Sequence, residues 1–377
     1  MKYKYLLLLT IIIFTSCTNN RQVVTYKRDI KQPKIILNHK NIKKISIKQI
    51  NLENNNTIIK KINKKIVIKQ NSTIAIIYSS HNIGKYAIEA VNTAIGYALY
   101  TKEKTNLKVF DIKDESSSSI QNILNNLYDN NISKVICFIT PKNIQNLYKY
   151  DKLDNFNIFL PLNNITQVTK TSLTHKNIIF GAISYTNQFK VLLQYSNSHI
   201  VEIYDNSSLG QILHNTLISL DNNITSIRLN NKNPNYYRLF KDNKTIKNSS
   251  LILNTSIVKS SILLSQLNVH NIHTKQILST SVNFLPLLFV LTQTDDRKNL
   301  IIANSLKPLS TKLEEISLLL DNDIAYNWVN FATIIAIDYL QYNNNRLFKD
   351  VKIKNNQVQY NIKLYKADRY KFNSIMP

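Results

Sequence analysis

The stretch TIAIIY at residues 73–78, followed by SSHN at residues 79–82, predicts a first strand and a turn. A short run of β-branched and apolar residues bounded by polar turn residues is typical of a buried strand. Residues from about Gly84 to Thr101 then predict an amphipathic helix, because their apolar positions fall three and four apart. These positions are Ala87, Val91, Ala94, Ile95, Ala98 and Leu99. A strand, a turn and a helix form the unit that builds a parallel sheet.

The same alternation continues along the chain. In the first part we expect further strands at 107–112, 134–139, 156–161 and 178–184, with helices at 116–128 and from Thr140-Pro141 onward. In the second part we expect strands at 199–204, 224–229, 250–253, 275–280 and 300–303, with helices at 186–196, 209–219 and 256–267. A helical region broken near Asn322 should cover 311–342, and residues 357–365 should form an exposed antiparallel strand.

The sequence therefore predicts an α/β protein with two lobes, each a mainly parallel sheet flanked by helices. Lobe 1 is expected to comprise residues 73–185 plus about 299–342. Lobe 2 is expected to comprise residues 186–298 plus about 343–377. Ligands of such folds bind at the carboxyl ends of the strands, in the cleft between the lobes.

Composition excludes several classes of chemistry. The chain has 377 residues, enough for two lobes of ordinary size, and contains only four glycines. No two of these glycines are closer than twelve residues, so neither a P-loop nor a G-x-G-x-x-G dinucleotide motif is present.

The net charge of +25 is unevenly distributed. Residues 18–72 hold 14 Lys and Arg against Asp29 and Glu53, which is almost half of the excess. The remaining lysines are scattered, as in solvated faces, and do not form a nucleic-acid footprint. We therefore expect no nucleic-acid partner.

The first residues have the pattern of an export signal. Lys2 and Lys4 precede an apolar run that ends at Phe14, and this run is too short to cross a hydrocarbon core of about 30 Å. Residues 1–16 are therefore expected to be a signal peptide. The sequence Phe14-Thr15-Ser16-Cys17 resembles the lipobox of bacterial lipoproteins, which implies that Cys17 is acylated, for example with palmitate.

An ordinary signal peptide with an incidental cysteine is the alternative. Because Thr18 follows Cys17 and not Asp, the resemblance implies the outer membrane as the address in a two-membrane cell. Residues 17–72 are expected to be a basic tether, within which short alternations such as 43–50 and 64–68 could instead pair as edge strands. Cys137 lies in an apolar run and is expected to be buried and inert.

Three segments resemble the type I periplasmic binding proteins, which include branched-chain amino-acid binding proteins and penicillin-binding protein activator lipoproteins. Residues 74–87 are similar to the first strand, cleft loop and first helix of that family. Residues 203–210 are similar to the strand and turn that open its second lobe, and residues 325–340 to its late helix. Two departures are the absence of the family's glycine in the first cleft loop and of its late glycine turn around 343–350.

Polar side chains at strand ends are the candidate ligand-binding groups. They are Ser79, Ser80, Thr140, Tyr185 and Asp205. In the solute-binding branch of the family, hydroxyl groups would hold an α-carboxylate and an acidic or aromatic partner would hold an ammonium group. Ser, Thr and Asp are also common as helix caps and turn residues after strands, so the alternative is a purely structural role.

Catalytic and metal-binding patterns are not evident in the sequence. There is no H-E-x-x-H motif and no G-x-S-x-G motif. His270 and His273 are expected in a surface loop, and the acidic pairs at 114–115 and 314–315 are adjacent rather than facing. We therefore expect no enzyme activity, no cofactor and no metal.

Two functions remain. The first is a lipid-anchored envelope protein, facing the periplasm, that docks on another envelope protein such as a peptidoglycan synthase, as the resemblance to the activators implies. The second is a solute receptor that delivers an amino acid or a similar small ligand to an ABC transporter. The altered cleft loop and the outer-membrane address favour the first. A structural lipoprotein without any closing motion is a third possibility.

Overall fold

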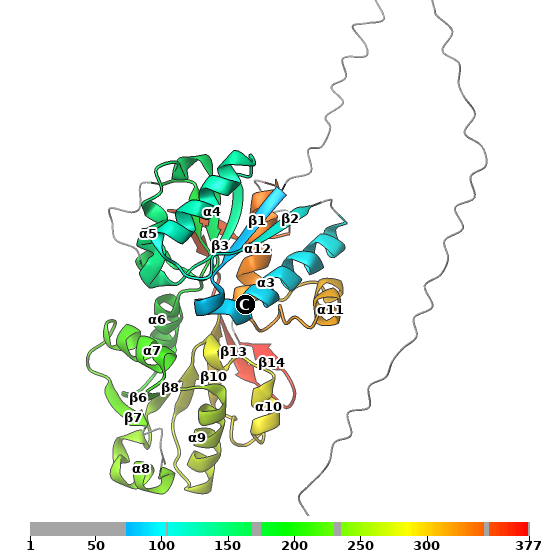
Figure 1. Cartoon of the computed structure of the whole chain (residues 1–377). Helices are drawn as coiled ribbons and strands as arrows, with labels where there is room; N and C mark the ends of the chain where they lie inside the picture. Colours follow the sequence, from blue (N-terminus) through cyan, green and yellow to red (C-terminus); the bar gives the residue numbers. More distant parts are fainter. Residues whose placement is uncertain (1–72, 103–104, 168–174, 230–234, 343–346, 376–377) are drawn as a thin grey trace, which may run out of the picture. The chain divides into compact units, whose positions relative to one another are not determined.

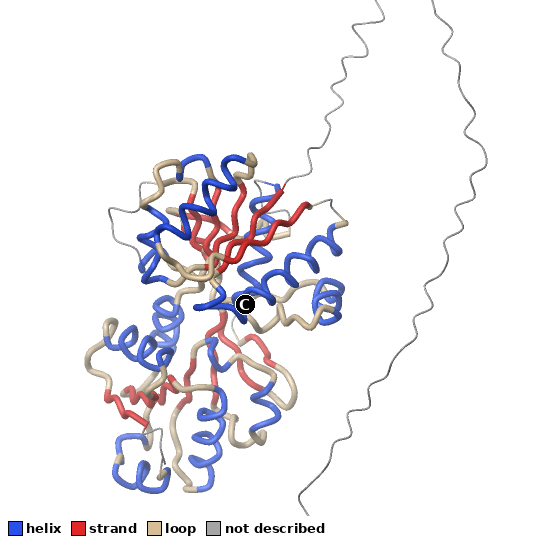
Figure 2. The backbone as a smooth tube through the Cα atoms, viewed as in Figure 1, coloured by secondary structure: helices blue, strands red, loops and turns tan. Residues whose placement is uncertain are grey.

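The computed structural model describes residues 73–375, apart from 103–104, 168–174, 230–234 and 343–346. Two predictions lie outside the described residues: the signal peptide with Cys17, and the basic tether. The described residues form two seven-stranded sheets, called here sheet A and sheet B, each flanked by helices (Figure 1, Figure 2). This confirms the predicted α/β class and its two mainly parallel sheets.

Sheet A has the strand order β11-β12-β5-β4-β3-β1-β2. Its strands are β1 (Thr73–Tyr78), β2 (Asn106–Asp111), β3 (Lys134–Phe138), β4 (Asn157–Leu160), β5 (Ile178–Phe180), β11 (Lys352–Lys354) and β12 (Gln357–Gln359). All of them pair in parallel except β11, which forms an antiparallel hairpin with β12.

Sheet B repeats this arrangement, with the strand order β14-β13-β10-β9-β8-β6-β7. Its strands are β6 (Ile200–Asp205), β7 (Thr225–Leu229), β8 (Ser250–Asn254), β9 (Gln276–Ser279), β10 (Leu300–Asn304), β13 (Lys363–Ala367) and β14 (Phe372–Ser374). The first five are parallel, and β13 and β14 are antiparallel additions at one edge.

Helices cover both faces of each sheet. The helices of lobe 1 are α3 (Ser80–Thr101), α4 (Ser117–Asp129), α5 (Ile144–Tyr148), α11 (Thr311–Leu319) and α12 (Trp328–Tyr342). Those of lobe 2 are α6 (Tyr185–Tyr195), α7 (Ser208–Ile218), α8 (Tyr236–Asp242), α9 (Ile257–Val269) and α10 (Leu287–Leu291). Figure 1 shows α3 and α12 against one face of sheet A and α4 and α5 against the other.

The strands alternate between two apolar layers. In β1, Ile74 and Ile76 face α3 and α12, whereas Ala75 and Ile77 face the layer of α4. Both faces are therefore buried, which explains why this strand is apolar without interruption. The thiol of Cys137 in β3 is buried as predicted, and burial raises its pKa above the ordinary value.

Three strands lie in the opposite lobe from the one that the sequence predicted. Strand β10 was expected in lobe 1, but it pairs with β9 in sheet B, because its five residues are buried and continue the parallel series. Strands β11 and β12 were expected in lobe 2, but β12 pairs with β5 through Gln357 and Phe180. The expected single strand at 357–365 is in fact divided between the two sheets, as β12 and β13.

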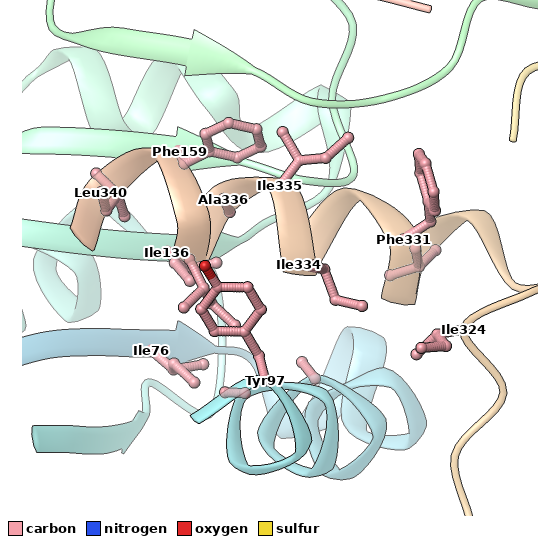
Figure 3. Close-up of a cluster of buried hydrophobic side chains, with 14 of the residues drawn as sticks. Ile76, Tyr97, Ile136, Phe159, Ile324, Phe331, Ile334, Ile335, Ala336 and Leu340 are labelled. Carbon is pink, nitrogen blue, oxygen red and sulfur yellow. The ribbon is translucent and has the colours of Figure 1, made fainter. Parts of the chain in front are cut away.

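Helix α12 lies in the core of lobe 1. Every residue from Val329 to Asp338 is buried, and Figure 3 shows Tyr97 reaching from α3 toward this helix. The Tyr97 hydroxyl donates a hydrogen bond to the Asp338 carboxylate, which also accepts the amide of Leu347 at 3.1 Å. None of the helices in the described part of the chain is long and apolar enough to cross a membrane.

We expect Tyr97→Phe to lower the free energy of unfolding by about 1–3 kcal/mol, because the buried Asp338 carboxylate loses a donor. Urea denaturation followed by circular dichroism measures this change. The control is Tyr100→Phe, on the same helix but only partly buried, which should cost less. Equal losses for the two variants would contradict a special role of the Tyr97–Asp338 contact.

Candidate functional site

The five predicted ligand-binding residues all lie where strands end or helices begin. Ser79 follows β1 and Ser80 starts α3, whereas Thr140 comes shortly after β3. Tyr185 starts α6, and Asp205 is the last residue of β6. The structure thus places them at the carboxyl ends of the strands in the two sheets. Their hydrogen bonds show which of them have partners inside the protein.

The first strand-end loop is closed by internal hydrogen bonds. Ser79 is fully buried, and its hydroxyl donates to the carbonyl of Lys113 at 2.7 Å. The amide of Ser80 donates to Asp111 Oδ1 at 3.1 Å, and Lys113 Nζ lies 2.8 Å from Asp111 Oδ2. The Lys113 contact is the main reason that the pKa of Asp111 lies well below its usual range. The loop therefore holds its own backbone in place.

Thr140 is hydrogen-bonded to a carboxylate that the sequence analysis did not assign to the site. Glu115 is buried, and it accepts the amide of Thr140 at 3.0 Å and also the Thr140 hydroxyl. Asn143 Nδ2 adds a third donor at 2.6 Å. Glu115 follows β2 and Thr140 follows β3, and these two strands lie on either side of β1 in sheet A. The contact between Glu115 and Thr140 ties two strand ends of sheet A to each other.

Asp205 is paired within lobe 2. Its carboxylate is buried and lies 2.6 Å from Lys259 Nζ of α9. The amide and hydroxyl of Ser207 donate to it at 3.0 and 2.5 Å. Burial by itself would raise the pKa of Asp205, but the hydrogen bonds from Lys259 and Ser207 outweigh it and the pKa is lowered. The negative charge of Asp205 is thus balanced inside the lobe.

Tyr185 differs from the other four residues. It is partly buried against the apolar layer between α6 and sheet B. Burial raises the pKa of its hydroxyl above the ordinary value, with a smaller contribution from the Tyr86 hydroxyl of α3. The Tyr185 hydroxyl is therefore neutral at physiological pH and would contact a ligand through a hydrogen bond and not through a charge.

A second buried carboxylate of lobe 2 lies beneath α7. Glu202 in β6 accepts hydrogen bonds from Asn254 Nδ2 at 2.6 Å and from the Ser226 hydroxyl at 2.8 Å, and it lies 2.7 Å from His214 Nδ1. The His214 ring stacks on Tyr204 with centroids 3.9 Å apart. The only sequence signal for this network is a glutamate in the middle of an apolar strand. These partners satisfy the glutamate and bind α7 to the sheet.

A polar cavity of about 410 Å³ lies beside the segments that connect the two sheets. Its lining includes Lys190 and Lys354, together with the polar side chains of Thr166, Ser184 and Gln357. The lining has no acidic residue, so the cavity suits a small polar or anionic molecule. None of the five predicted ligand-binding residues lines it, and sequence reasoning did not single out either lysine.

The described residues offer no metal centre: they contain no group of three or more His, Cys, Asp or Glu side chains placed to hold an ion. His270 ends α9 and His273 lies in the following loop, as expected. Among the carboxylates described above, Glu115, Asp205 and Glu202 are buried and hydrogen-bonded. These hydrogen bonds connect neighbouring segments within each lobe.

Comparison with solved structures identifies the fold. The chain is similar to a branched-chain amino acid ABC transporter protein from Thermus thermophilus with bound valine, with a TM-score of 0.56 and 13% identity over 81% of this chain and 95% of that chain. It is also similar to the LpoA C-domain from Haemophilus influenzae, described as a regulator of PBP1A, with a TM-score of 0.55 and 13% identity over 81% of this chain and 100% of that chain.

A longer LpoA chain from Haemophilus influenzae gives a TM-score of 0.56 and 12% identity over 81% of this chain and 59% of that chain. No protein-family model and no curated protein sequence matches the chain. These likenesses show that the chain has the two-lobed fold of type I periplasmic binding proteins, as its sequence segments indicated.

We expect Gly210→Ala to destabilise the protein by about 1–3 kcal/mol, because a methyl group there would lie 2.4 Å from Asp205 Oδ1 and 2.6 Å from the Asp205 carbonyl oxygen. Thermal unfolding measures the loss. Gly84→Ala is the matched control, since its added methyl group meets no atom within 4 Å and alanine favours a helix. A Gly210→Ala protein as stable as the control would contradict the tight packing of α7 on Asp205.

Proposed function

We propose that this chain is a non-enzymatic envelope lipoprotein whose two-lobed domain docks on another envelope protein, such as a peptidoglycan synthase. The observation that carries the proposal is the internal use of the strand-end polar groups. A receptor that closes on an amino acid needs hydroxyl and carboxylate groups that are free to meet it.

Three of the five candidate groups already have partners inside their own lobe. The hydroxyl of Ser79 binds a backbone carbonyl, Thr140 binds Glu115, and Asp205 binds Lys259. Turning any of them toward a ligand would break a hydrogen bond inside the lobe, and losing one such bond costs about 0.5–1.5 kcal/mol. These groups are therefore better explained as structural than as a solute-binding set.

An exposed apolar surface supports docking on a protein. Ile88, Ile95 and Leu99 are exposed along one face of α3, at spacings of seven and four residues. The end of α11 lies against the same helix, because Asn92 Nδ2 donates to the carbonyl of Leu320 at 3.0 Å. There Leu319 is 86% exposed. Clustered apolar side chains on two packed helices are typical of a protein-binding surface.

The fold is compatible with this role, because the similar LpoA C-domain is described as a regulator of PBP1A. Both kinds of similar protein favour a periplasmic or envelope location for this chain. We propose that Cys17 carries the lipid anchor, that residues 17–72 are the tether, and that the outer membrane is the address.

A solute receptor is the second candidate function, and the polar cavity favours it. Lys190 and Lys354 could hold a carboxylate there, and a volume of about 410 Å³ is sufficient for an amino acid. This ligand would lie near the connecting segments and not among the five predicted residues. The resemblance to a valine-bound transporter protein makes amino acids the first compounds to test.

Docking on a synthase predicts that the purified protein accelerates glycan polymerisation by a bifunctional penicillin-binding protein of the same organism. Leu99→Ser combined with Leu319→Ser should reduce the stimulation at least about fivefold, since exposed apolar contacts carry much of the binding energy of such surfaces. Val290→Ser, at an exposed apolar position of α10, is the control and should keep it. Stimulation that is absent, or equally reduced in both variants, would count against docking through α3 and α11.

The solute receptor makes the opposite prediction in a thermal-shift screen against amino acids. A ligand that binds only the folded state must raise the melting temperature. Under the docking proposal the screen is flat. A clear rise with one amino acid, lost in Lys190→Ala and Lys354→Ala but kept in Lys366→Ala, would replace docking by solute binding.

The lipid anchor predicts that Cys17→Ala releases the protein from the membrane fraction into the soluble fraction, because the cysteine sulfur can no longer be acylated. Cell fractionation followed by immunoblotting measures the distribution. Ser16→Thr, beside the acceptor, is the control and should stay in the membrane. A Cys17→Ala protein that remains membrane-bound even in high salt would contradict acylation at this residue.

A further inference from the structure

Lobe 2 carries a dense group of exposed cations on α8 and the single helical turn that follows it at Lys244–Ile246. Arg238, Lys241, Lys244 and Lys247 are all exposed. They lie near the amino-terminal edge of sheet B, opposite the edge that holds Asp205. This location separates the group from the strand-end residues described above.

A fifth cation joins the group from another part of the chain. The loop after α9 is hydrogen-bonded beside Lys247, because the Asn248 amide donates to the His273 carbonyl at 2.9 Å and the Lys275 amide donates to the Ser249 carbonyl at 2.9 Å. Lys275 is exposed. We call these five residues, Arg238, Lys241, Lys244, Lys247 and Lys275, the basic surface.

Acidic residues are scarce around the basic surface. Asp242 is the single acidic residue of the described segments 235–249 and 269–276, and its Oδ2 lies 3.2 Å from Arg238 Nε. Beyond His273 lie the exposed Asp295 and Lys298 and the buried Asp296, which accepts a hydrogen bond from Asn268 at 3.2 Å. The basic surface therefore keeps a net positive charge that attracts polyanions.

Exposed apolar side chains lie within the same surface. Tyr237 is 59% exposed, and Val269 at the end of α9 is 65% exposed. The ring of His270, which follows Val269, lies 5.4 Å from that of Tyr237 and 6.0 Å from that of Phe240, so α8 and the end of α9 are adjacent, as Figure 1 also shows. A soluble polyanion has no apolar region for these side chains, whereas a bilayer interface does.

We propose that the basic surface binds anionic lipid headgroups of a bilayer, with Tyr237 and Val269 entering the interface between headgroups and acyl chains. Each cation held near an anionic surface is expected to strengthen binding about fivefold. Aromatic side chains favour the headgroup level, since the ring is apolar and the hydroxyl stays hydrated. This proposal is independent of the partner proposed above, and it gives the lobe a second membrane contact besides the acyl chain.

The test uses the full chain with Cys17→Ala, so that no acyl chain contributes, and co-sedimentation with vesicles of phosphatidylcholine alone or mixed with phosphatidylglycerol. Lys241→Glu, Lys244→Glu and Lys247→Glu together should lower partitioning into the mixed vesicles at least about tenfold. The control combines Lys108→Glu, Lys312→Glu and Lys366→Glu, three exposed lysines on other elements, and changes the charge equally. Residues 18–72 are identical in both proteins, so their basic charge cancels in the comparison.

A local probe reports whether the surface touches lipid. The fluorescence of Tyr237→Trp should shift to shorter wavelength with the mixed vesicles, whereas Tyr370→Trp, at an exposed tyrosine elsewhere in lobe 2, should not shift. An equal loss of partitioning in the two triple variants would overturn the proposal. So would a basic surface whose charge reversal weakens binding of inorganic polyphosphate but leaves vesicle binding unchanged, because a soluble polyanion would then be the ligand.

Discussion

The burial of helix α12 is the constraint on which lobe 1 depends. A helix that is apolar on all sides must be enclosed by other apolar groups. Sheet A covers one side of α12 and α3 covers another. Its polar side chains contact neighbouring segments: Asn330 Nδ2 donates to Asn322 and to a backbone carbonyl, both at 2.7 Å, although Asn330 Oδ1 has no partner among the described residues, and Asp338 accepts from Tyr97. These contacts fix α3, and with it the loop after β1 and the apolar face of α3.

The strand ends also contain buried carboxylates that are hydrogen-bonded within their own lobe. In both sheets a buried carboxylate accepts hydrogen bonds from hydroxyl and amide groups at the strand ends. Glu115 does so in lobe 1, and Asp205 with Lys259 does so in lobe 2. The Glu115 carboxylate is held by neutral donors, whereas the Asp205 carboxylate is paired with a lysine of the same lobe.

Two exposed surfaces of different chemistry then remain on the described residues. The surface of α3 and α11 is apolar and suits a protein, whereas the basic surface near α8 combines cations with Tyr237 and suits anionic lipid. They lie on different lobes. A lipoprotein that held its second lobe at the bilayer would leave the first lobe free for a partner, so the two proposals are compatible in one molecule.

The local elements can be predicted from the sequence, because the periodicity of a strand or helix depends on neighbouring residues. β1, α4 capped by Ser116, and β6 followed by α7 were all predicted within a few residues. The sequence did not reveal the short helices α8 and α10, which lack a long apolar period. Only the tertiary structure decided which sheet receives β10 and β12, since pairing depends on distant strands. Only the tertiary structure also gave Ser79, Thr140 and Asp205 their partners, because Lys113, Glu115 and Lys259 come from other segments, and a hydrogen bond depends on proximity in space and not in sequence.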